Sequence, residues 1–96
     1  MKLTSPTDFE ILVALSNGKR NNATNLSHIL DKNRPYINTR LPVLTDYGLV
    51  ERIGPAPNSG LYVITEKGRV VADMQSAYND EETDFEAMLD RRLPDD

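Results

Sequence analysis

The sequence contains no cysteine and no tryptophan, and His28 is its only histidine. Without cysteine the chain can form neither disulfides nor thiolate metal sites. A lone histidine with no suitably spaced partners forms neither a metal cluster nor a catalytic triad, and neither a phosphate-binding loop nor a nucleophile elbow is present. We therefore expect no cofactor, no metal and no enzyme activity.

Long apolar runs are absent as well. No stretch approaches the roughly 18 uninterrupted apolar residues of a transmembrane helix, and residues 1–6 lack the apolar core of a signal peptide. We expect a soluble, cytoplasmic protein with no membrane partner. A chain of 96 residues, of which 39% are hydrophobic, can form one modest core of limited stability, which dimerisation would increase.

Charge is unevenly distributed along the chain. Residues 1–72 contain nine Lys or Arg and six Asp or Glu, a net of +3, whereas residues 73–96 contain two and nine, a net of −7. The overall net charge of −4 therefore averages a mildly basic body and an acidic C-terminal segment, and it does not exclude a nucleic-acid partner. Acidity is also typical of a high-salt proteome, in which case it says nothing about partners.

Apolar spacing near the N-terminus predicts two helices. The first spans Pro6–Asn17, with Ser5 as the N-cap and Gly18 as the stop signal. The second spans Ala23–Leu30 and is capped by Asn22. The predicted apolar residues of the two helices are Phe9, Ile11, Leu12, Val13, Leu15, Leu26, Ile29 and Leu30.

A third helix is predicted over Arg34–Asp46, after a short turn and with Asn33 as its cap. Pro35 falls in the permissive first turn, whereas Pro42 removes one backbone hydrogen bond inside the helix and is expected to bend it. The residues expected to face the core are Ile37, Leu41 and Leu44.

The next segment reads as a β-hairpin. Leu49–Ile53 and Leu61–Ile64 are rich in Val, Ile, Leu and Tyr, and a Pro/Gly-rich loop of residues 55–60 joins them. That loop is too long for a tight hairpin turn and is typical of a wing. The predicted fold is therefore α+β: a winged helix-turn-helix with a two-stranded wing and an extra C-terminal amphipathic helix.

The C-terminal part predicts two more helices. One is capped by Thr65 and runs to Tyr78, and the other lies within Glu81–Leu93. We assign residues 1–78 to the winged-helix domain and residues 79–96 to an acidic C-terminal helix. Its apolar stripe either packs on its own domain or forms the contact of a homodimer, as winged helices that read palindromes do. This candidate dimerisation stripe consists of Phe85, Met88, Leu89 and Leu93.

The solvent-facing side of the third helix is the main candidate for function. Arg can pair with guanine or phosphate, Asn pairs with adenine, and Tyr and Thr can contact a phosphate or a thymine methyl group. A helix-turn-helix places such a helix in the DNA major groove. An ordinary solvated helix face is the alternative interpretation. The candidate DNA-binding residues of this helix are Arg34, Pro35, Tyr36, Asn38, Thr39 and Arg40.

The turn and the wing supply weaker candidates. Lys32 and Arg52 could contact phosphates, as could Asn58 and Ser59 of the loop. The loop between Pro55 and Gly60 carries no Lys or Arg, so its tip offers no Arg for the minor groove. A rigid loop of turn residues is an equally good interpretation of this segment.

Five segments carry a family resemblance: Arg34–Ile37, Arg40–Leu41, Tyr47–Pro55, Gly60–Tyr62 and Ile64–Gly68. They closely resemble haloarchaeal winged-helix proteins usually labelled phage phi-H repressor-like, within the broad MarR/ArsR-like winged-helix group. The Arg-Pro-Tyr opening and the Pro/Gly-rich wing are the specific parts, whereas the segment Gly-Leu-Val-Glu is shared by many winged helices.

The resemblance covers roughly residues 8–72 and implies a DNA-binding transcriptional regulator, in particular a repressor, from a salt-rich cytoplasm. Lys32 and Pro42 depart from the family pattern. We expect a sequence-specific regulator that binds double-stranded DNA as a homodimer. The alternative is a winged helix that serves as a protein-interaction module, an adapter or a DNA mimic, and does not bind DNA. A basic face on the third helix would favour the first function, and an acidic face the second.

Overall fold

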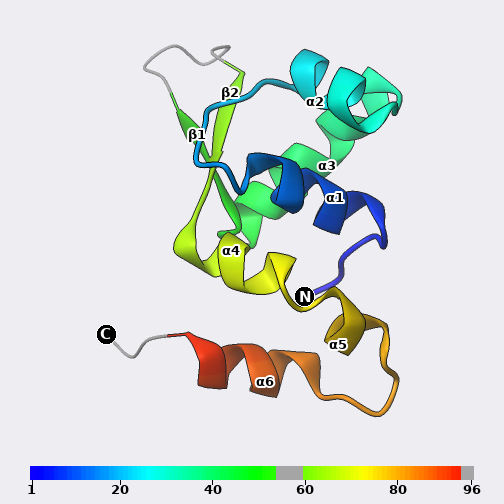
Figure 1. Cartoon of the computed structure of the whole chain (residues 1–96), viewed down its shortest axis with the longest axis vertical. Helices are drawn as coiled ribbons and strands as arrows, with labels where there is room; N and C mark the ends of the chain where they lie inside the picture. The colour runs from blue at the N-terminus through cyan, green and yellow to red at the C-terminus, as the bar shows by residue number, and fades with distance from the viewer. Residues whose placement is uncertain (54–59, 94–96) are drawn as a thin grey trace.

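The computed structural model describes residues 1–53 and 60–93 (Figure 1). Three helices, a two-stranded sheet and three further helices follow one another in these residues, which confirms the α+β winged helix-turn-helix. The elements are α1 (Thr7–Leu15), α2 (Ala23–Leu30), α3 (Arg34–Asp46), β1 (Val50–Ile53), β2 (Leu61–Ile64), α4 (Glu66–Ala72), α5 (Gln75–Asn79) and α6 (Phe85–Arg92).

The helices and the sheet enclose one hydrophobic core. Helix α1 packs on α2 and α4, α2 packs on α3, and α3 packs on β1. Strands β1 and β2 are antiparallel, with Val50 opposite Ile64 and Ile53 opposite Leu61. Figure 1 shows the hairpin and α2 toward one end of the long axis and α6 at the other. None of the helices in residues 1–53 and 60–93 has the length and apolar character needed to cross a membrane.

The start of α1 differs from the prediction. The helix begins at Thr7, one residue later than predicted, and Pro6 rather than Ser5 occupies the N-cap position, with no side-chain cap. The backbone carbonyls of Thr4 and Pro6 accept the first-turn N–H groups of Asp8 and Glu10, and the Asp8 Oδ2 accepts the backbone N–H of Thr4 at 2.7 Å. The Asp8 carboxylate thus binds the chain that precedes the helix and not the N–H groups of the first helical turn.

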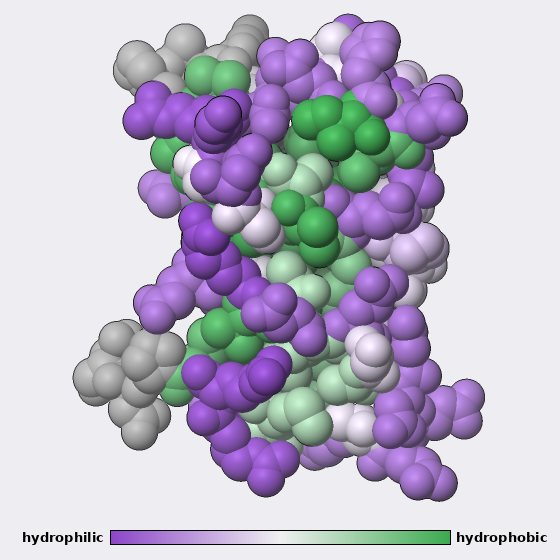
Figure 2. All heavy atoms as spheres, in the orientation of Figure 1, coloured by the Kyte–Doolittle hydropathy of each residue, from purple (hydrophilic) through white to green (hydrophobic). Residues whose placement is uncertain are grey.

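Two apolar side chains of the predicted core face solvent instead. Val13 of α1 is 59% exposed and Ile29 of α2 is 57% exposed, whereas Leu26 is fully buried. With only eight residues, α2 covers the core along a narrow stripe, so Ile29 falls outside it. Figure 2 shows hydrophobic atoms at the surface of this face, over α2 and α1.

A glycine allows α4 to lie close against the sheet. Thr65 caps α4 as predicted, accepting the N–H of Gly68 at 3.0 Å. A Cβ on Gly68 would lie 2.0 Å from the backbone carbonyl oxygen of Leu49, so a larger residue there would push α4 away from the root of β1. This contact fixes the base of the wing relative to the helical layer.

The single helix predicted after Thr65 is in fact two. The N–H of Asp73 and that of Met74 bind carbonyl oxygens only three residues earlier, Val70 at 3.2 Å and Val71 at 2.9 Å. This tighter turn ends α4 and starts α5 in a new direction. Met74 is 1% exposed at the corner, so the change of direction places its side chain in the core.

Helix α6 is shorter than the predicted segment Glu81–Leu93. Asp84 caps it, and the preceding residues form a turn instead of a helical start. Asp80 organises that turn by accepting the N–H of Glu82 and the hydroxyl of Thr83, both at 3.0 Å. An Asp side chain that binds nearby backbone groups in this way competes with helix formation.

The apolar side of α6 packs on its own domain. Phe85 and Leu89 are 8% and 3% exposed and belong to the same buried cluster as the core of α1 to α4. The ring of Tyr78 lies between Phe9 and Phe85, with centroids 5.5 Å and 5.1 Å away. The Tyr78 hydroxyl also bonds the backbone N–H and carbonyl of Leu3.

The predicted dimerisation stripe is therefore occupied within one chain. Its other two members, Met88 and Leu93, are partly buried against the same core. Of the two alternatives for this stripe, intramolecular packing is the one observed, with Phe85 and Leu89 buried in their own chain.

Leu89→Ala tests this role of α6. It removes a buried side chain from the core, and we expect the free energy of unfolding to fall by about 2–5 kcal/mol in urea denaturation. Asp90→Ala, at the exposed neighbouring position of the same helix, is the matched control and should change it by less than about 0.5 kcal/mol. If Leu89→Ala lowers the free energy of unfolding as little as Asp90→Ala does, α6 contributes nothing to the core.

Candidate nucleic-acid interface

The helix-turn-helix forms as its capping residues predict. The side chain of Asn22 accepts the N–H of Asn25 at 2.8 Å and starts α2, and the side chain of Asn33 accepts the N–H of Tyr36 at 3.3 Å and starts α3. Between the helices, Asp31 adopts a left-handed conformation with φ of 53°, which ends α2. The turn thus directs α3 away from α2 within three residues.

The N-terminal half of α3 presents its polar side chains to solvent. Arg34, Pro35, Asn38 and Thr39 are exposed, and Tyr36 is 38% exposed. The Thr39 hydroxyl donates to the Tyr36 carbonyl at 2.6 Å, so its proton is not available to a ligand. The helix continues through Pro42 to its end, and its predicted core residues are fully buried: Ile37, Leu41 and Leu44.

Arg40 does not share this exposure, and the prediction that it is available to solvent is wrong. Its Nε and Nη2 donate to Oδ1 and Oδ2 of Asp8 at 2.9 and 2.8 Å, and Asp8 is fully buried. The hydrogen-bonded carboxylate raises the pKa of the Arg40 guanidinium above its ordinary value. Arg40 therefore links α3 to α1 instead of presenting its charge to DNA.

Two other predicted residues lie at the edges of this surface. Lys32 Nζ lies 3.5 Å from Glu10 Oε1, which places the lysine on the α1 side of the turn. Arg52 is exposed on β1, opposite Tyr62 of β2. The predicted contacts Asn58 and Ser59 lie outside the residues that the structure describes.

Tyr62 joins the hairpin to the segment that precedes α2. Its backbone N–H and carbonyl bond the carbonyl and N–H of Asn21 at 2.8 and 3.0 Å, so Asn21 forms a bridge that adds to the edge of the hairpin. The same residue lines two hollows that lie between α3 and the hairpin. Tyr62 therefore lies at the boundary between the two hollows.

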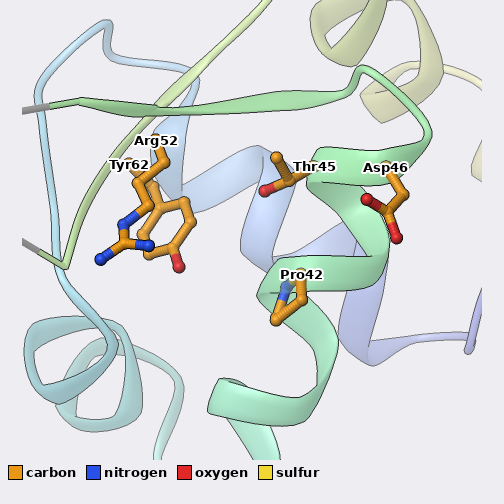
Figure 3. Close-up of a pocket in the computed structure, with 5 residues that line it drawn as sticks. All are labelled: Pro42, Thr45, Asp46, Arg52 and Tyr62. Carbon is orange, nitrogen blue, oxygen red and sulfur yellow. The ribbon is translucent and has the colours of Figure 1, made fainter. Parts of the chain in front are cut away.

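The two hollows differ in size and charge. The N-terminal hollow, of about 360 Å³, is lined by residues 22–24, Arg34, Asn38, Gly60 and Tyr62. The C-terminal hollow, of about 180 Å³, is lined by Pro42, Thr45, Asp46, Arg52 and Tyr62. Figure 3 shows Arg52 and Tyr62 on the hairpin side of the C-terminal hollow and the three α3 residues opposite them.

Sequence reasoning missed Tyr62 and residues 22–24 as parts of this surface. Tyr62 appeared only as an apolar strand residue, and Asn22 only as a helix cap. The signal available was the alternation of β2, which sets Tyr62 and Ile64 on one side of the strand, but the sequence does not indicate that this side of the wing faces α3.

Solved structures share this architecture. The reduced form of MarR from E. coli superimposes with a TM-score of 0.63 and 20% identity, over 95% of this chain and 67% of that one. Its oxidized form gives 0.60 and 24%, over 92% and 62%. A mutant of ZitR from Lactococcus lactis gives 0.61 and 22%, over 99% and 65%. This chain thus spans about two thirds of the length of those proteins.

These similarities establish the fold, which is a MarR-like winged helix. No protein-family model matches the sequence, and no curated protein does either. The similarity to these solved structures supports the MarR-like part of the resemblance that the sequence shows, at the level of the fold.

Arg40→Met tests the link between α1 and α3. The change leaves the buried Asp8 carboxylate without its partner, so we expect the free energy of unfolding to fall by about 3–5 kcal/mol in urea denaturation. Arg34→Met removes the same charge from the exposed part of the same helix and should change it by less than about 0.5 kcal/mol. Comparable losses in both variants would contradict the assigned role of Arg40.

Proposed function

We propose that this chain is a sequence-specific regulator of transcription that binds double-stranded DNA through α3. One observation carries the proposal: the exposed N-terminal half of α3 presents Arg34, Tyr36 and Asn38 beside the root of the wing. These side chains can donate to phosphates and base edges. The MarR-like fold supplies the setting, because a helix-turn-helix exposes such a helix for the major groove.

The charge on α3 favours DNA over the alternative of a protein-interaction module or DNA mimic. The exposed N-terminal half of α3, residues 34–39, carries Arg34 and no acid. A mimic of DNA would present carboxylates, and those of this chain are concentrated in residues 73–96, in and around α5 and α6. The surface of α3 next to the wing is therefore the one suited to a polyanion.

Repression by steric occlusion of a promoter is part of the proposal, and it rests on the resemblance to phage phi-H repressor-like proteins. The same resemblance supports a haloarchaeal cytoplasm as the setting. We also propose a homodimer, since two copies would read a palindrome. Because Phe85 and Leu89 are buried in their own chain, we propose that the contact between copies uses other residues.

Asn38→Ala tests the assigned reading helix. Duplexes bound by the wild type are first selected from a random library, and affinities are then measured by fluorescence anisotropy. We expect Asn38→Ala to weaken the selected duplex by about 1–3 kcal/mol and to relax the preference at one base pair.

Asn79→Ala removes the same amide from an exposed position of α5 and is the matched control. It should leave both affinity and preference unchanged. If the wild type enriches no sequence from the library, the proposed function is wrong. If it enriches one and Asn38→Ala reads it as the wild type does, Asn38 is not a reader.

A further inference from the structure

The N-terminal hollow has the features of an anion site. Arg34 is the only charged residue among the described residues that line it, and Tyr62 stands across from it on the wing. In residues 1–53 and 60–93, Arg34 pairs with no carboxylate, and the Tyr62 hydroxyl bonds no protein group. A guanidinium with five N–H donors and a phenol thus belong to side chains that line one hollow of about 360 Å³, and neither group has a partner among the described residues.

We propose that this hollow seats one phosphodiester group of the DNA backbone, held by Arg34 and Tyr62. The inference rests on the proposed function, because it specifies how DNA is held at the same surface. Arg is suited to the task, since its planar fork matches two phosphate oxygens. Asn38 lines the hollow from α3 and is left free to reach a base edge.

The C-terminal hollow does not offer the same chemistry. It has half the volume, about 180 Å³, and its lining contains the Asp46 carboxylate as well as Arg52, so the charges of the lining cancel, whereas Arg34 stands alone in the N-terminal hollow. A phosphate there would meet a like charge close to the C-terminal end of α3, where the helix dipole is also negative. We therefore place the DNA backbone at the N-terminal hollow, which Arg34 lines, and Tyr62 separates this hollow from the C-terminal one.

The position of Tyr62 is well defined, which suits it to this task. Its backbone pairs with Arg52 on one side and with Asn21 on the other. The Tyr62 side chain thus projects from a strand that pairs with β1 on one edge and is bridged to Asn21 on the other. Arg34 lies in the first turn of α3. A phosphate bound by both side chains would fix α3 relative to the backbone without reading sequence.

Salt dependence of binding tests the seat. Fluorescence anisotropy of two short duplexes of unrelated sequence gives the slope of log affinity against log salt for full-length wild type, Arg34→Met and Arg91→Met. We expect Arg34→Met to reduce the slope by about one on both duplexes, because one phosphate contact is lost. Arg91→Met removes the same charge from an exposed position on α6 and should leave the slope unchanged.

Tyr62→Phe tests the second ligand. Loss of one hydroxyl should weaken both duplexes about three- to tenfold at fixed salt, and equally, because a phosphate contact carries no sequence information. An effect confined to one duplex would make Tyr62 a base reader and would overturn its assignment. Circular dichroism of each variant must match the wild type.

The outcomes separate the seat from the proposed function. If the wild type binds both duplexes and the slopes of Arg34→Met and Arg91→Met agree, the seat is wrong and DNA binding stands. If the wild type binds neither duplex and enriches no sequence from the random library, both fail. Inorganic phosphate, added at constant ionic strength, identifies a third case: direct binding of phosphate to the wild type, lost in Arg34→Met, while neither duplex is bound would mean that the site takes free phosphate and would overturn the DNA assignment.

Discussion

The orientation of α3 depends on one buried carboxylate. Asp8 is fully buried on α1, yet it binds two donors of Arg40 on α3 and the backbone N–H of Thr4. An ion pair of this kind adds little net stability compared with an apolar pair, because both charges must leave water. Its directional bonds do restrict how α3 can rotate and slide against α1. The exposed side of α3, and hence the whole candidate interface, inherits its geometry from this pair.

The features that could be predicted from the sequence are those decided within a few residues. Asn22, Asn33 and Thr65 cap their helices as predicted because the donor each one binds lies three residues ahead. Ile37 and Leu44 are buried as predicted because the period of the helix fixes which side they share. The two strands followed in the same way from local composition.

What could not be predicted depends on contacts between distant segments. Arg40 looked like a DNA contact because nothing in the sequence indicates that Asp8, 32 positions away, would bind it. The stripe around Phe85 left two partners open, since amphipathic spacing shows that a face is buried and not what buries it. Tyr62 could not be predicted as a site residue because it lines the hollows only where the wing lies beside α3.

The position of α6 has a consequence for how the molecule would approach the DNA proposed as its partner. The acidic segment lies at the end of the long axis away from α2 and the hairpin (Figure 1), so the protein carries an electric dipole along that axis. Near a polyanion this dipole turns the molecule before contact. At about 0.01 M salt the field reaches about 30 Å, close to the 38 Å length of the molecule, whereas at about 0.15 M it reaches about 8 Å. In dilute salt the molecule would therefore turn its basic end toward the polyanion before the two touch. At higher salt it would turn only when the two surfaces are already close.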